Sequence, residues 1–212
     1  MNIQLFHLDQ LKVQGDVEQR LRILDEQERE RYQQSGLPFL LCRSELKRVL
    51  AQESGLAAHD IHFCYQEQGK PSCPQLPDLH FNISHSKDLL LIGTSTSPIG
   101  VDIEKRRPRQ AKQLAAIAKR FMPDEQREAF ITRGCPMREF YDCWCACEAL
   151  IKLKGMSMWQ AKQLPAYLYH GGQIHFTEGE SQASIDIQIL EVDENYSAAY
   201  ACQVFSLPAP SI

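Results

Sequence analysis

Two carboxylates, Asp102 and Glu104, lie two residues apart in the stretch IGVDIE at residues 99–104. Apolar residues alternate with the acids there, and this alternation is typical of a β-strand. Both carboxylates would then lie on one face of the strand, roughly 7 Å apart along the backbone. A divalent cation between them would offset the repulsion of like charges and favour the ionised forms. The stretch therefore predicts a metal site.

A second polar group, Ser84, His85 and Ser86, follows a short apolar run earlier in the chain. Its hydroxyl and imidazole groups are of the kind that donate to a phosphate. We expect a loop at this group. We also expect a β-hairpin made of residues 89–93 and 99–104, because the residues between them are rich in Ser, Thr and Pro. One small sheet would then bring the phosphate donors and the metal site together.

A helix over Arg138–Lys154, closed by Gly155, carries the third informative group. Spacings of three and four residues place two aromatic residues, a carboxylate and an ammonium on one stripe: Tyr141, Trp144, Glu148 and Lys152. A Glu–Lys pair four residues apart is common on exposed helices and stabilises them by only about 0.3–0.5 kcal/mol. Because the aromatic residues belong in a core, we expect Glu148 and Lys152 at the boundary of that core.

Composition limits the classes of partner. The 212 residues suffice for one large domain or for two small ones of about 100 residues each. The net charge of −4 gives no basic surface for duplex DNA or for an anionic membrane. No apolar run reaches about 18 residues, and the first ~30 residues are too charged for a signal peptide. We therefore expect a cytoplasmic protein without nucleic-acid or membrane partners.

The eight cysteines invite a metal or disulfide interpretation. Cys143, Cys145 and Cys147 are spaced by two residues, which on a helix does not form the knuckle of a structural zinc site. Reduced thiols that serve as small apolar side chains are the favoured interpretation.

The remaining patterns predict an α+β protein. Expected helices cover 11–34, 39–53 and 112–121, and expected strands cover 1–8, 58–65, 166–169, 174–176, 184–191 and 196–205. We expect the last four strands to form an antiparallel meander. The favoured domain boundary lies near 98–100, which gives the halves 1–98 and 99–212.

The order of four motifs resembles the 4′-phosphopantetheinyl transferases of the Sfp type. These motifs are Gly69-Lys70-Pro71, then Phe81–Ser86 (FNISHS), then Ile99–Glu104 (IGVDIE), and then Trp144, Glu148, Ala149 and Lys152 in one helix. Each motif alone would be weak evidence, but together and in this order they are specific.

The resemblance implies a monomer of two pseudo-symmetric α+β halves, each with a small antiparallel sheet packed on helices, and a ligand cleft between them. It implies that Asp102, Glu104 and Glu148 hold a metal, and that Lys152, Ser84 and His85 contact phosphates. It also assigns Lys70, Arg43, Ser44 and, more loosely, Arg31 to the nucleotide end of coenzyme A. Three carboxylates without sulfur or imidazole ligands favour Mg²⁺, or Mn²⁺, over zinc.

The reaction that the resemblance implies transfers 4′-phosphopantetheine from coenzyme A to a serine of an apo carrier protein and releases adenosine 3′,5′-bisphosphate. Glu148, Glu125 or a metal-bound water could accept the serine proton. The basic residues of 105–109 and 119–120 are candidates to meet an acidic carrier protein of acyl, peptidyl or polyketide type.

One residue departs from the family pattern, because Cys147 occupies the position before Glu148 where the family usually has a lysine. Two other functions stay open at this point. One is a metal-dependent hydrolase of nucleotide diphosphates, and the other is a coenzyme A-binding protein that has lost its activity.

Overall fold

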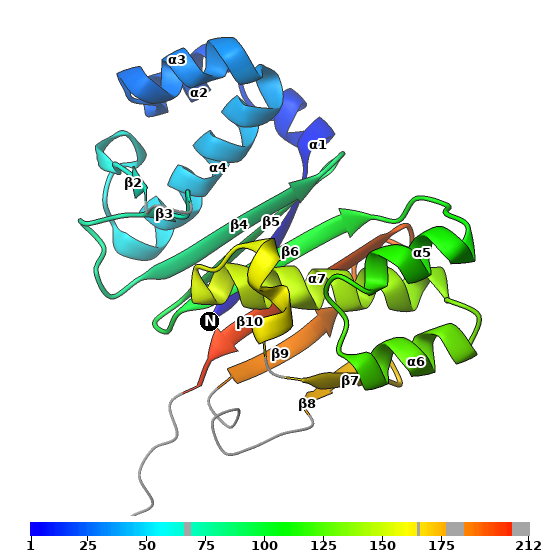
Figure 1. The fold of residues 1–212 in the computed structure, drawn as a ribbon. Helices are drawn as coiled ribbons and strands as arrows, with labels where there is room; N and C mark the ends of the chain where they lie inside the picture. Colours follow the sequence, from blue (N-terminus) through cyan, green and yellow to red (C-terminus); the bar gives the residue numbers. More distant parts are fainter. Residues whose placement is uncertain (66–68, 165, 177–184, 205–212) are drawn as a thin grey trace, which may run out of the picture.

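The computed structural model describes residues 1–65, 69–164, 166–176 and 185–204. Two three-stranded antiparallel sheets organise these residues (Figure 1). In the first sheet, β5 (Leu89–Ser95) lies between β1 (Asn2–His7) and β4 (His80–Ser86). The expected N-terminal strand is thus confirmed as β1. The helix α4 (Leu37–Ser54) shares an apolar core with this sheet, as expected for the second helix.

The second sheet repeats this arrangement. Its central strand, β10 (Tyr196–Gln203), lies between β6 (Ile99–Lys105) and β9 (Ile185–Leu190). In both sheets, the strand that comes first in the chain pairs with the strand that comes last. Helix α7 (Met137–Lys154) packs along β6 and β10 and ends, as predicted, at Gly155 in the left-handed conformation. The α+β class is therefore confirmed. The division into 1–98 and 99–212 stays a proposal, which places the boundary between β5 and β6.

Gly100 explains how closely α7 approaches β6. A Cβ atom at this position would overlap the carbonyl oxygen of Ala149 and crowd the backbone nitrogen of Leu153. Only glycine lets the helix backbone rest directly on the strand. This contact fixes the height of α7 above β6, and with it the position of the helix residues that face the strand.

The predicted hairpin of residues 89–93 and 99–104 is wrong, although both strands exist. β1 and β4 already occupy the two edges of β5, so β6 pairs with β10 instead. The two sheets still meet, because β4 lies beside β6 over much of its length (Figure 1). The loop expected at Ser84–Ser86 is also a correction, since these residues form the end of β4. They pair with Leu89–Leu91 of β5.

The predicted helix over 11–34 is three shorter helices: α1 (Leu8–Val13), α2 (Val17–Ile23) and α3 (Glu26–Ser35). Asp16 and Asp25 interrupt it, because each side chain caps the helix that follows by accepting a backbone N–H bond. Charge-rich helical periodicity does not reveal such internal caps. The strand expected at 58–65 is mostly wrong too: a short 3-10 helix (Ala58–Asp60) comes first, and only β2 (Cys64–Tyr65) is a strand, paired with β3 (Pro71–Ser72).

The C-terminal half contains α5 (Ala111–Ala118), α6 (Asp124–Thr132), a 3-10 segment (Met158–Gln163), β7 (Tyr167–His170) and β8 (Gln173–Phe176). The predicted four-strand meander is wrong, because β7 and β8 form a separate two-stranded sheet while β9 and β10 join β6. Residues 184 and 205 of the expected strands lie outside the described residues.

All eight cysteines are unpaired, and seven of them are buried, which confirms the expected role of reduced apolar side chains. None of the helices among the described residues combines the length and the apolar character needed to cross a bilayer.

Candidate functional site

The junction between β4 and β6 gathers the acids and hydroxyls that the sequence singled out. Asp102 is buried in β6, and its Oδ1 accepts hydrogen bonds from Ser84 Oγ at 2.8 Å and from Lys152 Nζ at 2.6 Å. Lys152 also donates to Ser84 Oγ at 3.0 Å and to the carbonyl oxygen of Val101 at 3.1 Å. Strand β4, strand β6 and helix α7 thus meet at one ammonium group.

Glu104 continues the same face of β6. Its Oε2 accepts a hydrogen bond from Ser86 Oγ at 2.9 Å, and the same hydroxyl accepts the backbone N–H of Lys105 at 3.1 Å. Burial raises the pKa of Glu104, and the nearby charge of Asp102 raises it further, while the Ser86 hydrogen bond acts in the opposite direction. The carboxylate is thus held in a partly dehydrated position near a second acid.

Glu148, on α7, is the third predicted metal ligand. It is half-buried, and burial raises its pKa, with the charges of Asp102 and Glu104 adding to the effect and Lys152 opposing it. The three acids are therefore close enough to influence one another. As they stand, however, the His, Cys, Asp and Glu side chains of the described residues form no group of three that could hold a metal ion. The three-ligand set stays a prediction.

An unsatisfied atom nonetheless fits a cation. Asp102 Oδ2 is buried and has no hydrogen-bond partner among the described residues. Leaving such an oxygen without a partner is costly, and a divalent ion would satisfy it. Mg²⁺ commonly takes one or two carboxylates and completes its shell with water and substrate phosphate oxygens. The acids of this junction therefore fit an ion that binds together with a phosphate-bearing substrate.

A cavity of about 320 Å³ reaches Lys152, the ion-pair partner of Asp102. Four cations contribute to its lining, namely Arg31, Arg43, Lys70 and Lys152, and we call it the cation-rich cavity. The Arg43 side chain is 90% buried, since only 10% is exposed, and its Nη1 has no hydrogen-bond partner within the described structure. Arg43 also donates to Tyr65 Oη at 2.9 Å, which orients the guanidinium. This concentration of positive charge predicts an anionic ligand in the cavity.

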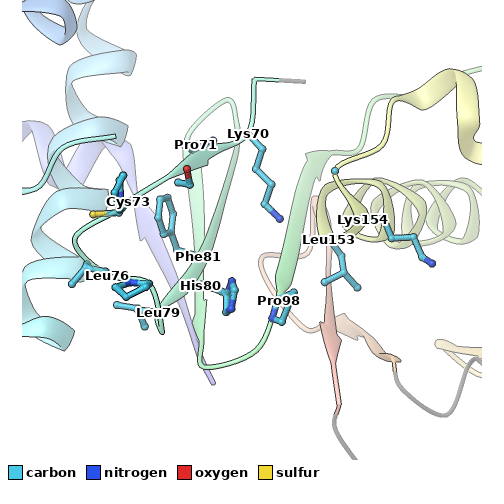
Figure 2. A pocket seen from close by; sticks show the side chains of 14 residues that line it. Lys70, Pro71, Cys73, Leu76, Leu79, His80, Phe81, Pro98, Leu153 and Lys154 are labelled. Carbon is cyan, nitrogen blue, oxygen red and sulfur yellow. The ribbon is translucent and has the colours of Figure 1, made fainter. Parts of the chain in front are cut away.

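A second cavity, of about 440 Å³, shares Lys70, Pro71 and Gly155 with the first (Figure 2). Lys70 extends from its loop toward β6 (Figure 2), and its Nζ donates to the carbonyl oxygens of Lys152 in α7 at 2.7 Å and of Ile99 in β6 at 3.3 Å. Burial lowers the pKa of this ammonium. Lys70 therefore links the first half of the chain to the second as well as lining the cation-rich cavity.

A third cavity, of about 250 Å³, reaches Glu104. Glu104 forms part of its lining, together with the aromatic residues Phe140, Tyr141 and Trp144 and the basic residues Lys105, Arg107 and Arg109. Tyr141 Oη accepts the backbone N–H of Arg107 at 3.2 Å, so the helix anchors the basic segment that follows β6.

The structure does not bring every predicted site residue to the junction. Ser44 is fully buried, where its hydroxyl accepts from Arg20 at 2.9 Å and donates to the carbonyl oxygen of Leu41, so its observed role is structural. Glu125 is exposed in the first turn of α6, which packs on α5 and β7 away from β4 (Figure 1). His85 is exposed on β4 between Ser84 and Ser86. Because side chains alternate along a strand, it points away from the face that the two serines share.

Comparison with known proteins identifies the family. Residues 98–203 match the model of the 4′-phosphopantetheinyl transferase superfamily. The chain belongs to this superfamily. It is 30% identical over 208 residues to 4′-phosphopantetheinyl transferase Sfp of Bacillus subtilis (strain 168), covering 94% of this chain and 91% of the relative. It is 28% identical over 163 residues to the transferase psf-1 of Bacillus pumilus, covering 76% and 68%. Over 98 residues it is 35% identical to AcpT of Escherichia coli (strain K12), covering 45% and 50%.

The chain is thus a phosphopantetheinyl transferase, as the motif order predicted. The region that matches the superfamily model contains the acids Asp102, Glu104 and Glu148 and the ammonium of Lys152. Ser84 and Ser86 of β4 precede residue 98, so they lie outside that region. Only a longer alignment, such as the one of 208 residues with Sfp, can include them.

Cys147 is the residue that departs from the expected family pattern. In this transferase the position is fully buried within the core of α7, and burial raises the pKa of the thiol to about 12. A small neutral side chain suits this environment, whereas an ammonium would be dehydrated there.

The sequence did not reveal the roles of three residues of the junction, although it singled out Ser86 as a phosphate donor. Asn82 is buried in β4, and its Oδ1 accepts the backbone N–H of Val101 at 2.9 Å. Ser86 donates a hydrogen bond to Glu104, and Gly100 leaves room for the backbone of α7. The spacing of two between Asn82, Ser84 and Ser86 was a usable signal, because it places all three on one face of a strand. The expectation of a loop at this point concealed it.

Proposed function

We propose that this transferase moves the 4′-phosphopantetheine group of coenzyme A to a serine hydroxyl of an apo carrier protein and releases adenosine 3′,5′-bisphosphate. The observation that carries this proposal is the double role of Lys152. Its side chain lines the cation-rich cavity and also pairs with Asp102 at 2.6 Å. A diphosphate anchored by the cavity would therefore reach the acids of β6 directly.

The cavity supplies the binding of the nucleotide end. Arg43 is buried and pairs with Glu28 at 3.5 Å through Nε, but its Nη1 amino group has no partner in the described part of the chain and is suited to a phosphate, and Arg31 adds charge. Lys70 keeps one N–H free after its two carbonyl bonds, because an ammonium has three donors. We assign these three side chains to the phosphates and base of the nucleotide.

The transfer is a displacement at the pantetheine-side phosphorus of the diphosphate. The carrier serine oxygen forms a bond to this phosphorus, and the bond from phosphorus to the bridging oxygen of adenosine bisphosphate breaks. Lys152 complements charge on the phosphate oxygens, with Ser84 as a further donor. We assign Glu148 as the acceptor of the serine proton, because it lies beside the acids while Glu125 is exposed on α6. His85 stays a proposed phosphate contact that requires a ligand approaching the exposed face of β4.

We assign Mg²⁺, with Mn²⁺ as a substitute, to Asp102, Glu104 and Glu148. When bound, the ion supplies positive charge that draws electrons toward the leaving diphosphate oxygen. The unpartnered oxygen of Asp102 supports this assignment.

The carrier protein is proposed to approach the cavity lined by Trp144 and the basic segment after β6. Arg107 and Arg109 are exposed there, and Lys119 and Arg120 are exposed at the end of α5. Arg106 is engaged elsewhere, since it donates to Ser197 Oγ and to the carbonyl oxygen of Glu194. An acidic helical domain would complement the exposed cations.

Incubation of the protein with coenzyme A, Mg²⁺ and an apo carrier protein tests the proposal. Transfer adds about 340 Da to the carrier, which intact mass spectrometry detects. Release of free phosphopantetheine without a gain in carrier mass would instead indicate the hydrolase. Coenzyme A binding without any product would indicate an inactive binding protein.

A further inference from the structure

The two sheets meet through side chains. β4 pairs with β5, and β6 pairs with β10, so no backbone ladder joins β4 to β6. Three residues of β4 that share one face reach across instead: Asn82 to Val101 N, Ser84 to Asp102 and Ser86 to Glu104. These three contacts set the register between the strand that carries hydroxyls and the strand that carries acids.

The hydrogen bonds of Ser86 have a fixed direction. The backbone N–H of Lys105 can only donate, so the hydroxyl oxygen must accept that bond. Its single hydrogen is then left for Glu104 Oε2, 2.9 Å away. Ser86 is buried, with 8% of its surface exposed, so water does not compete for this hydrogen. The arrangement permits one orientation of the hydroxyl and holds one oxygen of the carboxylate.

The hydrogen bond from Ser86 determines which oxygen of Glu104 is available to a ligand. Oε2 is occupied by Ser86, and Oε1 makes no hydrogen bond or ion pair to any residue that the structure describes. A carboxylate tethered at one oxygen loses most of its rotational freedom, which favours ligation through the other. Partners that orient a metal ligand in this way typically contribute about 10-fold to 100-fold to metal affinity or activity.

We propose that Ser86 is a positioning residue that orients Glu104, so that Oε1 is presented to the divalent ion and the diphosphate. The inference rests on the proposed function and on the assignment of Glu104 as a metal ligand. Ser86 touches neither the substrate nor the ion. It acts only through Glu104 and through the backbone of Lys105.

Mn²⁺ binding to the enzyme–coenzyme A complex, followed by electron paramagnetic resonance, tests this role without relying on turnover. We expect Ser86→Ala to weaken Mn²⁺ binding about 10-fold. Ser86→Cys, which keeps most of the volume but offers a weak donor, should weaken it similarly. Ser86→Thr retains the hydroxyl and should stay close to the unmodified protein. Unfolding temperature, measured on each variant, shows whether the fold is retained.

Thr94→Val is the matched control. Thr94 is buried in β5 of the same sheet and donates to Glu53 at 2.6 Å, so this variant loses a partly buried hydroxyl-to-carboxylate bond. It should lower stability while leaving Mn²⁺ affinity unchanged. If Ser86→Ala and Ser86→Cys bind Mn²⁺ as tightly as Thr94→Val does, the positioning role is refuted. The proposed function fails by a different result, namely an unmodified protein that binds coenzyme A and transfers nothing.

Discussion

Lys152 and Asp102 form an ion pair of 2.6 Å that joins the last turns of α7 to the middle of β6. The Lys152 ammonium has three N–H donors, and all three form hydrogen bonds within the protein. The acceptors are Asp102 Oδ1, Ser84 Oγ and the carbonyl oxygen of Val101. A phosphate can therefore accept a hydrogen bond from Lys152 only by displacing one of these partners. An ion bound at the unpartnered Oδ2 of Asp102 would withdraw charge from the carboxylate and weaken the pairing of Oδ1 with Lys152, which couples metal binding to substrate binding.

Asp102→Asn tests this coupling. The variant keeps the shape of the side chain but removes its charge, so we expect kcat/KM for transfer to fall by about 100-fold or more. Coenzyme A binding without metal should become tighter, because a repulsive charge near the diphosphate is lost and Lys152 is released. Transfer kinetics with Mg²⁺ measure the first effect, and isothermal titration calorimetry without Mg²⁺ measures the second. Unchanged turnover in this variant would remove Asp102 from the metal site.

Gly100→Ala should separate α7 from β6. The added methyl group overlaps the backbone of the helix, and such overpacking costs about 1–3 kcal/mol of unfolding free energy. Transfer activity should fall further than stability explains, because Glu148 and Lys152 shift relative to Asp102. Gly15→Ala is the control, since a Cβ there meets nothing closer than 3.4 Å. Urea denaturation and transfer kinetics are measured on both variants. Equal stability and equal activity of Gly100→Ala and Gly15→Ala would contradict the expectation.

Arg43→Gln should raise the KM for coenzyme A by about 10-fold, the worth of one charge-assisted hydrogen bond. The effect should be smaller for 3′-dephospho-coenzyme A if the guanidinium contacts the 3′-phosphate. Arg48→Gln, on the same helix but outside the cation-rich cavity, serves as the comparison. Equal losses with both substrates would place Arg43 at another part of the ligand.

Arg109→Glu should raise the KM for the carrier protein several-fold and leave that for coenzyme A unchanged, because the residue is exposed beyond the acids. The effect should shrink as salt is added. Arg22→Glu, exposed on α2, supplies the comparison. Carrier kinetics that do not respond to Arg109→Glu would direct the search for the docking surface elsewhere.

Cys147→Lys restores the residue usual in the family, yet we expect it to destabilise this protein by about 3 kcal/mol or more. The position is fully buried, so an ammonium there would lose its hydration. Cys147→Ala should cost about 1 kcal/mol. Chemical denaturation distinguishes the two. If Cys147→Lys is stable and more active than the unmodified protein, the introduced ammonium leaves the core and reaches the acids of the junction.

Helix α7 could be predicted from the sequence because its apolar stripe and its terminal Gly155 are local signals. The acids of β6 could be found because strand alternation is local too. The strand partners could not be predicted: the short connection after β5 favours a hairpin, and only the occupied edges of β5 exclude one. Motif order identified the family, yet it could not show that Ser44 faces Arg20 or that Lys70 bonds to backbone carbonyls, because both contacts join distant segments.

The absence of a backbone ladder between β4 and β6 also suggests how the enzyme could be inhibited. A compound that separated these strands would break all three side-chain bridges together, and it would also open the apolar cluster that residues of β5, β6 and β10 share. The 440 Å³ cavity, which is lined by Phe81 of β4 and by Pro98 just before β6, offers an entrance for such a compound. An inhibitor seated there would disable the chemistry without resembling either substrate.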